Sequence, residues 1–123
     1  MSLAEMFEDY GIGVLATAGA DGTVNTAVYA RPHQLSETTL AWGMTEGLSY
    51  DNVRENPNAS FLFKTTAPGF TGVRISLKMI QSVQEGELLA RIKEHTDQVV
   101  GPGAGDPVTH AVVFEIVATR PLF

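Results

Sequence analysis

Three histidines are the side chains in this sequence best suited to acid–base chemistry, and they lie far apart along the chain. They are His33, His95 and His110. A hydrolytic triad would need one of them beside an activated serine and an orienting acid, and the sequence has no Gly-x-Ser-x-Gly turn. None of them lies one helical turn from a second metal ligand on a predicted helix. We therefore interpret the histidines as unrelated, predict no metal site, and assign no catalytic residue.

A glycine-rich segment, Gly101–Gly105, is a second candidate for ligand binding. A phosphate-binding loop follows a strand, opens a helix and ends in Lys followed by Ser or Thr. This segment has none of these features. We interpret it as a connector between a helix and the final strand.

The cations are unevenly distributed and indicate a site for a small anion. Five of the eight Lys and Arg residues lie between residues 31 and 78, whereas the chain as a whole has a net charge of −6. Within that range, Met44–Asn52 reads as a strand end, a turn at Gly47 and a helix start at Ser49. A helix start offers free N–H groups, and the Thr45 and Ser49 hydroxyls could add donors. The alternative is that Ser49 only caps its own helix.

The alternation of apolar and polar residues predicts the elements that would position these groups. We expect six strands, at Ile12–Ala18, Thr23–Arg31, Thr38–Met44, Ala59–Thr65, Gly72–Val83 and His110–Thr119. Ala20-Asp21-Gly22 supplies the first hairpin turn. Short helices are expected after Ser2, at Ser49–Asn56 and at Glu85–Thr96. Strands joined by such short connections favour an antiparallel sheet that closes into a barrel.

Composition limits the protein classes that remain. The chain has 123 residues, of which 44% are hydrophobic, and it contains no cysteine. This predicts a single domain over residues 1–123 and excludes disorder, disulfides and thiol catalysis. The acidic balance disfavours nucleic acid as a partner. Because no apolar run is long enough to span a membrane and no secretory signal is recognised, we expect no membrane partner and a cytoplasmic location.

Several motifs, in order, resemble the FMN-binding split-barrel superfamily, the pyridoxamine 5′-phosphate oxidase-like proteins, and most of all its small single-domain FMN-binding members. Residues 13–28 (GVLATAGADGTVNTAV) are similar to the opening hairpin of the family. Residues 49–61 (SYDNVRENPNASF) are similar to its helix and following strand, and residues 72–75 (GVRI) to the start of a later strand. The resemblance implies a mainly β fold, a six-stranded antiparallel split barrel with small peripheral helices.

The resemblance also implies a homodimer with FMN at the subunit interface, acting as a small oxidoreductase or electron carrier. A redox partner protein or a small-molecule electron acceptor would then be a further partner. The ring would lie along the second strand, and Trp42, Gly43 and Met44 would approach the ring and ribityl chain. Thr45, Ser49 and Asn52 would meet the ribityl-phosphate end, with Arg54, Lys64 and Arg74 as candidates to neutralise the phosphate. The cofactor-binding residues implied are Asn25, Thr26, Ala27, Val28, Trp42, Gly43, Met44, Thr45, Ser49, Asn52, Arg54 and Arg74.

Two departures from the family pattern leave alternatives open. Leu48 and Tyr50 stand where the family helix usually carries Lys or Arg, and Ser76-Leu77 replaces a family glycine. The chain could instead be a relative that binds F420 or haem, or a non-catalytic binding module. The motifs of vitamin B6 oxidases are not present near the C-terminus, so that activity is not implied.

Overall fold

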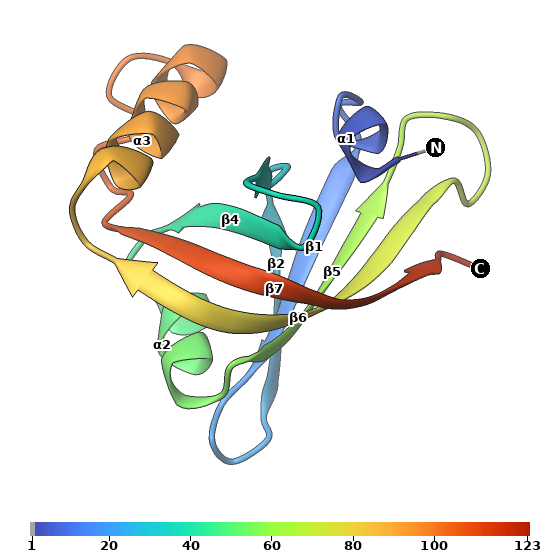
Figure 1. Ribbon diagram of the computed structural model, residues 1–123, viewed down its shortest axis with the longest axis horizontal. Coiled ribbons are helices and arrows are strands. Elements are labelled where there is room, and N and C mark those ends of the chain that lie inside the picture. Colours follow the sequence, from blue (N-terminus) through green and yellow to red (C-terminus); the bar gives the residue numbers. More distant parts are fainter. Residues whose placement is uncertain (1) are drawn as a thin grey trace.

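The computed structural model describes residues 2–123, which form a curved antiparallel sheet with three helices around it (Figure 1). The strands are β1 (Ile12–Ala18), β2 (Val24–Tyr29), β3 (His33–Gln34), β4 (Thr39–Met44), β5 (Asn58–Lys64), β6 (Gly72–Val83) and β7 (His110–Pro121). The helices are α1 (Leu3–Met6), α2 (Leu48–Glu55) and α3 (Glu87–Val100). No helix within the described residues is long and apolar enough to cross a membrane.

The sheet confirms the predicted mainly β, antiparallel architecture but corrects its details. Its strands follow the order β2-β1-β5-β6-β7-β4-β3, so there are seven strands and not six. The additional strand, β3, has two residues and pairs with β4. The predicted closure is wrong, because β2 and β3 lie at the two ends of this order and do not pair with each other.

The chain between β2 and β3 explains why the sheet stays open. Pro32 has no N–H group and cannot donate to a strand ladder. Side chains, not strand partners, satisfy the backbone near it. The Trp42 indole Nε1 donates to the Ala30 carbonyl at 2.9 Å, and Arg31 Nη1 donates to the Phe7 carbonyl at 2.9 Å.

Two apolar clusters hold the sheet and helices together. The larger lies inside the curved sheet and includes Trp42, Phe61 and Phe114. The smaller lies between α3 and the other face of β4 and β7, and it includes Ala41, Ile92 and Val113. The end of β7 nearest His110 is therefore covered on both faces, as predicted, whereas Val117 further along is 62% exposed.

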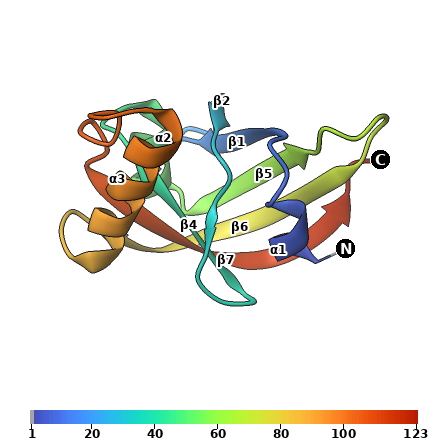
Figure 2. The ribbon, with the colours of Figure 1, turned by 90° about the horizontal axis from the view of Figure 1, so that it is seen from above.

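The helices differ from prediction mainly at their ends. Ser2 and Glu5 form the expected capping box, but α1 ends at Met6 instead of reaching Gly11. The N-cap of α2 is Gly47, not Ser49, and no side chain caps this helix. Seen from above, α2 and α3 lie at one end of the sheet, and α1 and the C-terminus lie at the other (Figure 2).

Candidate functional site

The start of α2 forms a polar cradle, which we define as Gly47, Ser49, Asn52 and their β-strand partners Asn25 and Thr17. Ser49 and Asn52 are buried. The Asn25 amide donates to Ser49 Oγ at 3.4 Å, and the Asn52 amide donates to Thr17 Oγ1 at 3.1 Å. Thr17 and Asn25 are paired in the β1–β2 ladder. These hydrogen bonds hold α2 on the sheet, while the first N–H groups of the helix have no side-chain cap.

Geometry therefore rules out the alternative in which Ser49 caps its own helix. Ser49 lies inside α2, two positions beyond the N-cap, and its hydroxyl accepts from another element. Uncapped N–H groups carry partial positive charge and bind anions or other acceptors. The cradle thus has the hydrogen-bond donors that a phosphate or a ribityl chain requires.

Formal positive charge is absent from the cavity beside the cradle. This cavity of about 420 Å³ is lined by Gly19, Ala20, Asp21, Thr23, Val24, Asn25, Leu48, Asn52 and Glu55. None of these described residues is Lys or Arg. Both carboxylates there accept a hydrogen bond from a backbone N–H group. The Thr23 N–H donates to Asp21 at 3.0 Å, and the Ala20 N–H donates to Glu55 at 3.4 Å. The bond from Thr23 lowers the pKa of Asp21. A phosphate would be bound there by neutral donors of this chain.

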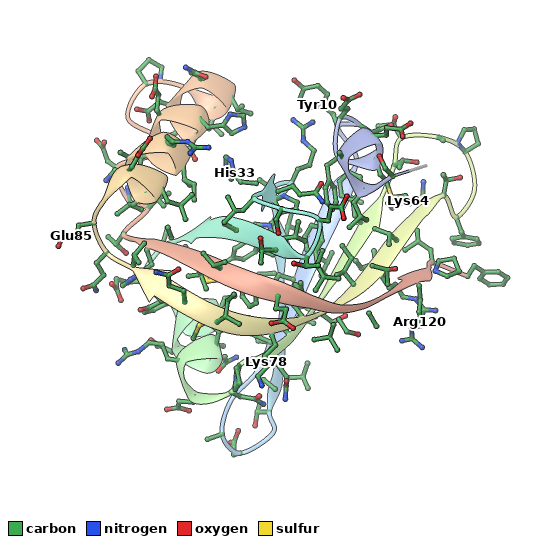
Figure 3. The ribbon with its side chains drawn as sticks, in the orientation of Figure 1. Tyr10, His33, Lys64, Lys78, Glu85 and Arg120 are labelled. Atoms are coloured by element: carbon green, nitrogen blue, oxygen red, sulfur yellow. The ribbon has the colours of Figure 1, made fainter. Side chains whose placement is uncertain are left out.

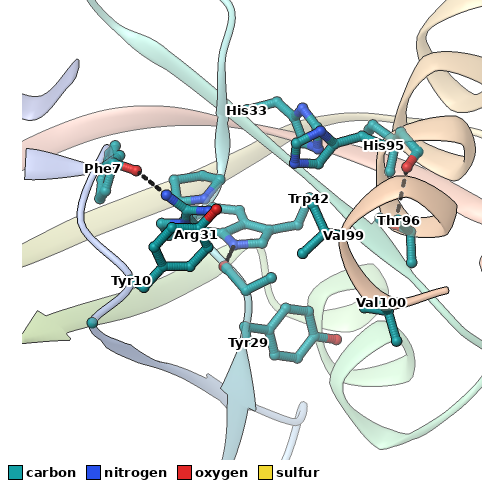
Figure 4. Close-up of a pocket in the computed structure, with 15 residues that line it drawn as sticks. Phe7, Tyr10, Tyr29, Arg31, His33, Trp42, His95, Thr96, Val99 and Val100 are labelled. Atoms are coloured by element: carbon teal, nitrogen blue, oxygen red, sulfur yellow. Dashed lines mark hydrogen bonds between the residues drawn. The ribbon is translucent and has the colours of Figure 1, made fainter. Parts of the chain in front are cut away.

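A second cavity, of about 470 Å³, lies beneath α3, and we call it the α3 cavity (Figure 4). The segment between β2 and β3, residues 30–32, forms part of its wall. Its lining is Phe7, Tyr10, Gly11, Tyr29, Ala30, Arg31, Pro32, His33, Trp42, Gly43, Ile92, His95, Thr96, Val99 and Val100. Tyr10 and His33 stand on the same side of the sheet, and Lys78 lies on the opposite side (Figure 3).

Two histidines meet at this cavity, which corrects the interpretation of three unrelated histidines. The ring centroids of His33 and His95 are 5.0 Å apart, in an edge-to-face arrangement. Burial lowers the pKa of His33, and the positive charges of His95 and Arg91 lower it further. The imidazole of His33 is therefore held toward its neutral, proton-accepting form.

Tyr29 connects the α3 cavity to the cradle. Its side chain lines the cavity, and its hydroxyl interacts with Ser49. Burial raises the pKa of the Tyr29 phenol, and the hydrogen bond with Ser49 partly offsets that rise. The two candidate sites are therefore separated by one tyrosine side chain.

A third cavity, of about 490 Å³, lies on the other side of α2, and sequence reasoning missed it. His110 is 1% exposed, and its Nε2 lies 2.6 Å from Glu46 Oε1. The hydrogen bond with His110 lowers the pKa of Glu46. The Tyr50 ring stacks on His110 with centroids 3.6 Å apart, and Arg54 lies over the outer side of Tyr50. No local motif indicates this cluster, because Glu46 and His110 are 64 residues apart.

Comparison with solved structures decides the fold. An FMN-binding protein from Syntrophomonas wolfei subsp. wolfei is similar with a TM-score of 0.84 and 24% identity, covering 97% of this chain and 82% of that one. The chain has the fold of the FMN-binding split-barrel superfamily. The predicted resemblance is thus confirmed at the level of the fold.

Other proteins of known structure with this fold are named for different ligands. A putative pyridoxamine 5′-phosphate oxidase from Listeria innocua has a TM-score of 0.75 and 19% identity, covering 98% of this chain and 94% of that one. An F420 reductase has a TM-score of 0.75 and 15% identity, with 94% of both chains covered. HutZ, a heme storage protein from Vibrio cholerae, has a TM-score of 0.62 and 17% identity, covering 98% of this chain and 95% of that one. No protein-family model and no curated protein matches the chain.

The split barrel brings only some of the predicted site residues together. Asn25, Ser49 and Asn52 meet in the cradle, and Thr45 is exposed just before it. On β2, Ala27 is half-buried on the same face as Asn25, whereas Thr26 and Val28 point outward. Trp42 and Gly43 line the α3 cavity, and Met44 is buried in the core.

The predicted phosphate-neutralising cations lie away from the cradle within one protomer. Arg54 lines the cavity with Glu46 and His110. Arg74 Nε donates to the Pro121 carbonyl at 2.9 Å, at the C-terminal end of the sheet. Lys64 donates to the carbonyls of Thr65 and Ala67. Sequence reasoning missed Arg31, His33 and His95, which only the packing of α3 brings together.

Proposed function

We propose that the chain is an FMN-binding flavoprotein that works as a homodimer, with the flavin phosphate at the α2 cradle. The observation that supports this most directly is the uncapped start of α2, held beside Asn25 and Asn52 on a split-barrel sheet. The similarity to an FMN-binding protein of the same fold supports the choice of cofactor. The activity we propose is that of a small oxidoreductase or an electron carrier, with a partner protein or small molecule exchanging electrons.

The dimer is proposed from an apolar outer face of the sheet, which we define as Val14, Val24, Val28 and Leu62. Val14 pairs with Val28 on one side and with Leu62 on the other, so these side chains share one face. Val24 and Val28 are 68% and 73% exposed. Adjacent exposed apolar side chains of this kind mark an interaction surface. A second copy packing there would cover the edge strand β2 beside the cradle.

A bound flavin would supply the redox chemistry, so this chain's own residues have to bind and orient it. The first N–H groups of α2 and the amides of Asn25 and Asn52 would hold the phosphate and ribityl oxygens. The small Ala27 on the inner face of β2 would let a flat ring approach the backbone. Tyr29 and Trp42 would exclude water from the end that faces the α3 cavity.

The direct test is reconstitution of the purified protein with FMN, followed by desalting and an absorption spectrum. We expect one flavin per chain to be retained. Loss of all flavin on desalting would contradict the proposal.

A substitution at the cap position tests the location of the phosphate. Gly47 is extended, and a Cβ added there meets no atom within 4 Å, so larger residues fit. Asp at this position caps the free N–H groups and also repels phosphate, with a cost of a few kcal/mol at about 4 Å. We expect Gly47→Asp to weaken FMN binding more than about tenfold while the melting temperature rises or stays constant.

Gly47→Asn is the matched control, because Asn caps helices equally well without a charge. We expect FMN affinity to fall in the order wild type, Gly47→Asn, Gly47→Asp. Equal FMN affinity in all three proteins would show that the phosphate is not bound at the cradle.

One observation favours a second candidate, a non-catalytic split-barrel binding module without an anionic cofactor. The cavity beside the cradle carries Asp21 and Glu55 and, among the described residues, no Lys or Arg. The absorption spectrum of the protein as purified distinguishes flavin, deazaflavin, haem and the absence of a chromophore.

A further inference from the structure

The α3 cavity differs in charge from the rest of the molecule. The chain has 14 acidic residues and a net charge of −6. Even so, the described residues that line this cavity include Arg31, His33 and His95 and no carboxylate. The other two cavities both contain acids, Glu46 in one and Asp21 with Glu55 in the other. A cavity that is basic within an acidic protein favours an anionic ligand.

Arg31 retains unused donors for such an anion. A guanidinium has five N–H groups. The hydrogen bond that the described residues provide for Arg31 uses Nη1, which donates to the Phe7 carbonyl. The Tyr10 ring lies 4.2 Å from the guanidinium carbon, so the guanidinium is held between a backbone carbonyl and an aromatic face. A guanidinium held in this way is oriented in advance for a carboxylate.

The histidine pair also lines the cavity, toward α3. In Figure 4, His33 and His95 approach each other above Trp42, and Val99 and Val100 line the α3 side. Protonation of His33 is opposed by burial and by the neighbouring His95 and Arg91, which lower its pKa. A bound anion would favour the protonated form of His33.

The remaining walls are apolar and largely aromatic. Tyr29 is half-buried and Val99 is exposed, so both offer apolar surface to a ligand, whereas Phe7, Trp42 and Ile92 line the cavity as buried core residues. The volume of about 470 Å³ lies in the range of small-molecule sites. Aromatic walls favour a flat apolar body, because ring stacking adds to the gain from burial.

We propose that the α3 cavity binds a planar aromatic carboxylate, with its rings beside Tyr29 and Val99 and its carboxylate attracted by Arg31, His33 and His95. The binding itself does not depend on flavin. A role for the aromatic carboxylate as the reaction partner of a bound flavin would, in contrast, rest on the proposed function of FMN binding.

The probe is naphthalene-2-carboxylate, and its neutral amide, naphthalene-2-carboxamide, is the comparison. Trp42 is the single tryptophan of the chain, so its indole N–H gives one identifiable cross-peak in an NMR ¹H–¹⁵N spectrum. We expect titration of flavin-free protein with the carboxylate to shift this cross-peak. We expect the carboxylate to bind about tenfold more tightly than the amide, since charge-assisted hydrogen bonds are stronger than neutral ones. No shift with the carboxylate, or equal affinity of the two compounds, would overturn the proposal.

Substitutions test which side chains of the cavity attract the carboxylate of the probe. We expect Arg31→Gln to remove the preference for the carboxylate while binding of the amide is retained. His95→Gln on the exposed side of α3 should reduce the same preference and leaves the Arg31–Phe7 contact intact, which covers the case in which Arg31→Gln fails to fold. Arg74→Gln is the control, since Arg74 contacts Pro121 outside the cavity. An unchanged preference in both cavity variants would overturn the proposal. FMN retention is measured separately, so failure of one hypothesis leaves the other intact.

Discussion

At the scale of single residues, His33 shows how packing changes the chemistry of a side chain. Its pKa lies below the ordinary value of 6.5 because it is half-buried and lies near His95 and Arg91 on α3. The unfolded chain therefore takes up a proton at His33 at a higher pH than the folded chain does. Protonation of the unfolded state lowers the free energy of unfolding as the pH falls below about 6.5.

We expect His33→Gln to flatten this pH dependence. Urea unfolding between about pH 5 and 7 should show a wild-type stability that falls toward acid and a variant stability that falls less. Above about pH 7 the two proteins should have the same pH dependence, because His33 is neutral in both the folded and unfolded states. An identical slope in both proteins across the acid range would contradict the half-buried, neutral state of His33.

Leu48 is one of the two positions at which the family resemblance in the sequence implies a cation. It is 58% exposed and lines the cavity beside Asn25 and Asn52. We expect Leu48→Lys to tighten FMN binding about tenfold, the effect of one added charge-assisted contact to phosphate. Leu35→Lys adds the same charge in the β3–β4 turn and should leave FMN affinity unchanged. Titration of FMN fluorescence measures both, and an equal effect of the two variants would refute a specific phosphate contact.

At the scale of elements, the contact between β4 and α3 determines the shape of the α3 cavity. Gly43 lies in β4 where α3 and the segment before β7 approach most closely. A Cβ at this position would lie 2.6 Å from Ile92 Cγ2 and 2.7 Å from Val108 Cγ1. Both of these side chains are buried and β-branched, so they have little freedom to move.

We therefore expect Gly43→Ala to destabilise the protein by about 1–3 kcal/mol, the typical cost of overpacking a core. Urea unfolding measures this cost. Gly47→Ala is the comparison, because its added Cβ meets no atom within 4 Å and should cost less. Equal stability of wild type and Gly43→Ala would show that α3 is less tightly packed on β4 than the structure indicates.

At the scale of the whole molecule, the monomer already buries the apolar residues that the sequence alone suggests for a dimer interface. By their number in so short a chain, Phe61, Phe63, Val112 and Phe114 are more apolar surface than one domain is expected to hide, but each is fully buried in the core of one chain. The outer face around Val28 remains as the surface available to a second copy. The dimer therefore stays a prediction, with a new set of contacts.

We expect Val28→Asp to produce a monomer in sedimentation experiments at micromolar concentration, because it places a charge on the outer face. Phe70→Asp is the control, since Phe70 is 71% exposed in the β5–β6 loop. FMN retention should fall with the dimer if both protomers enclose the flavin. A Val28→Asp protein that remains a dimer would exclude this face as the interface.

Local patterns in the sequence were sufficient for most of the elements. The alternation in residues 24–29 predicted β2, and Asp21-Gly22 predicted its turn, where Gly22 adopts a positive φ of 85°. These features depend on neighbouring residues, whose torsional preferences and alternating faces are local properties of the chain. The sequence therefore determined the six longer strands, whereas the two-residue strand β3 carries no such local pattern.

Tertiary structure alone decided which distant residues meet. Ser49 bonds to Asn25 and not to its own helix end, Arg54 turns toward Tyr50, and His33 lies beside His95. These contacts depend on the strand order and on where α2 and α3 pack against the sheet. The whole apolar core determines that packing, and no local pattern encodes it.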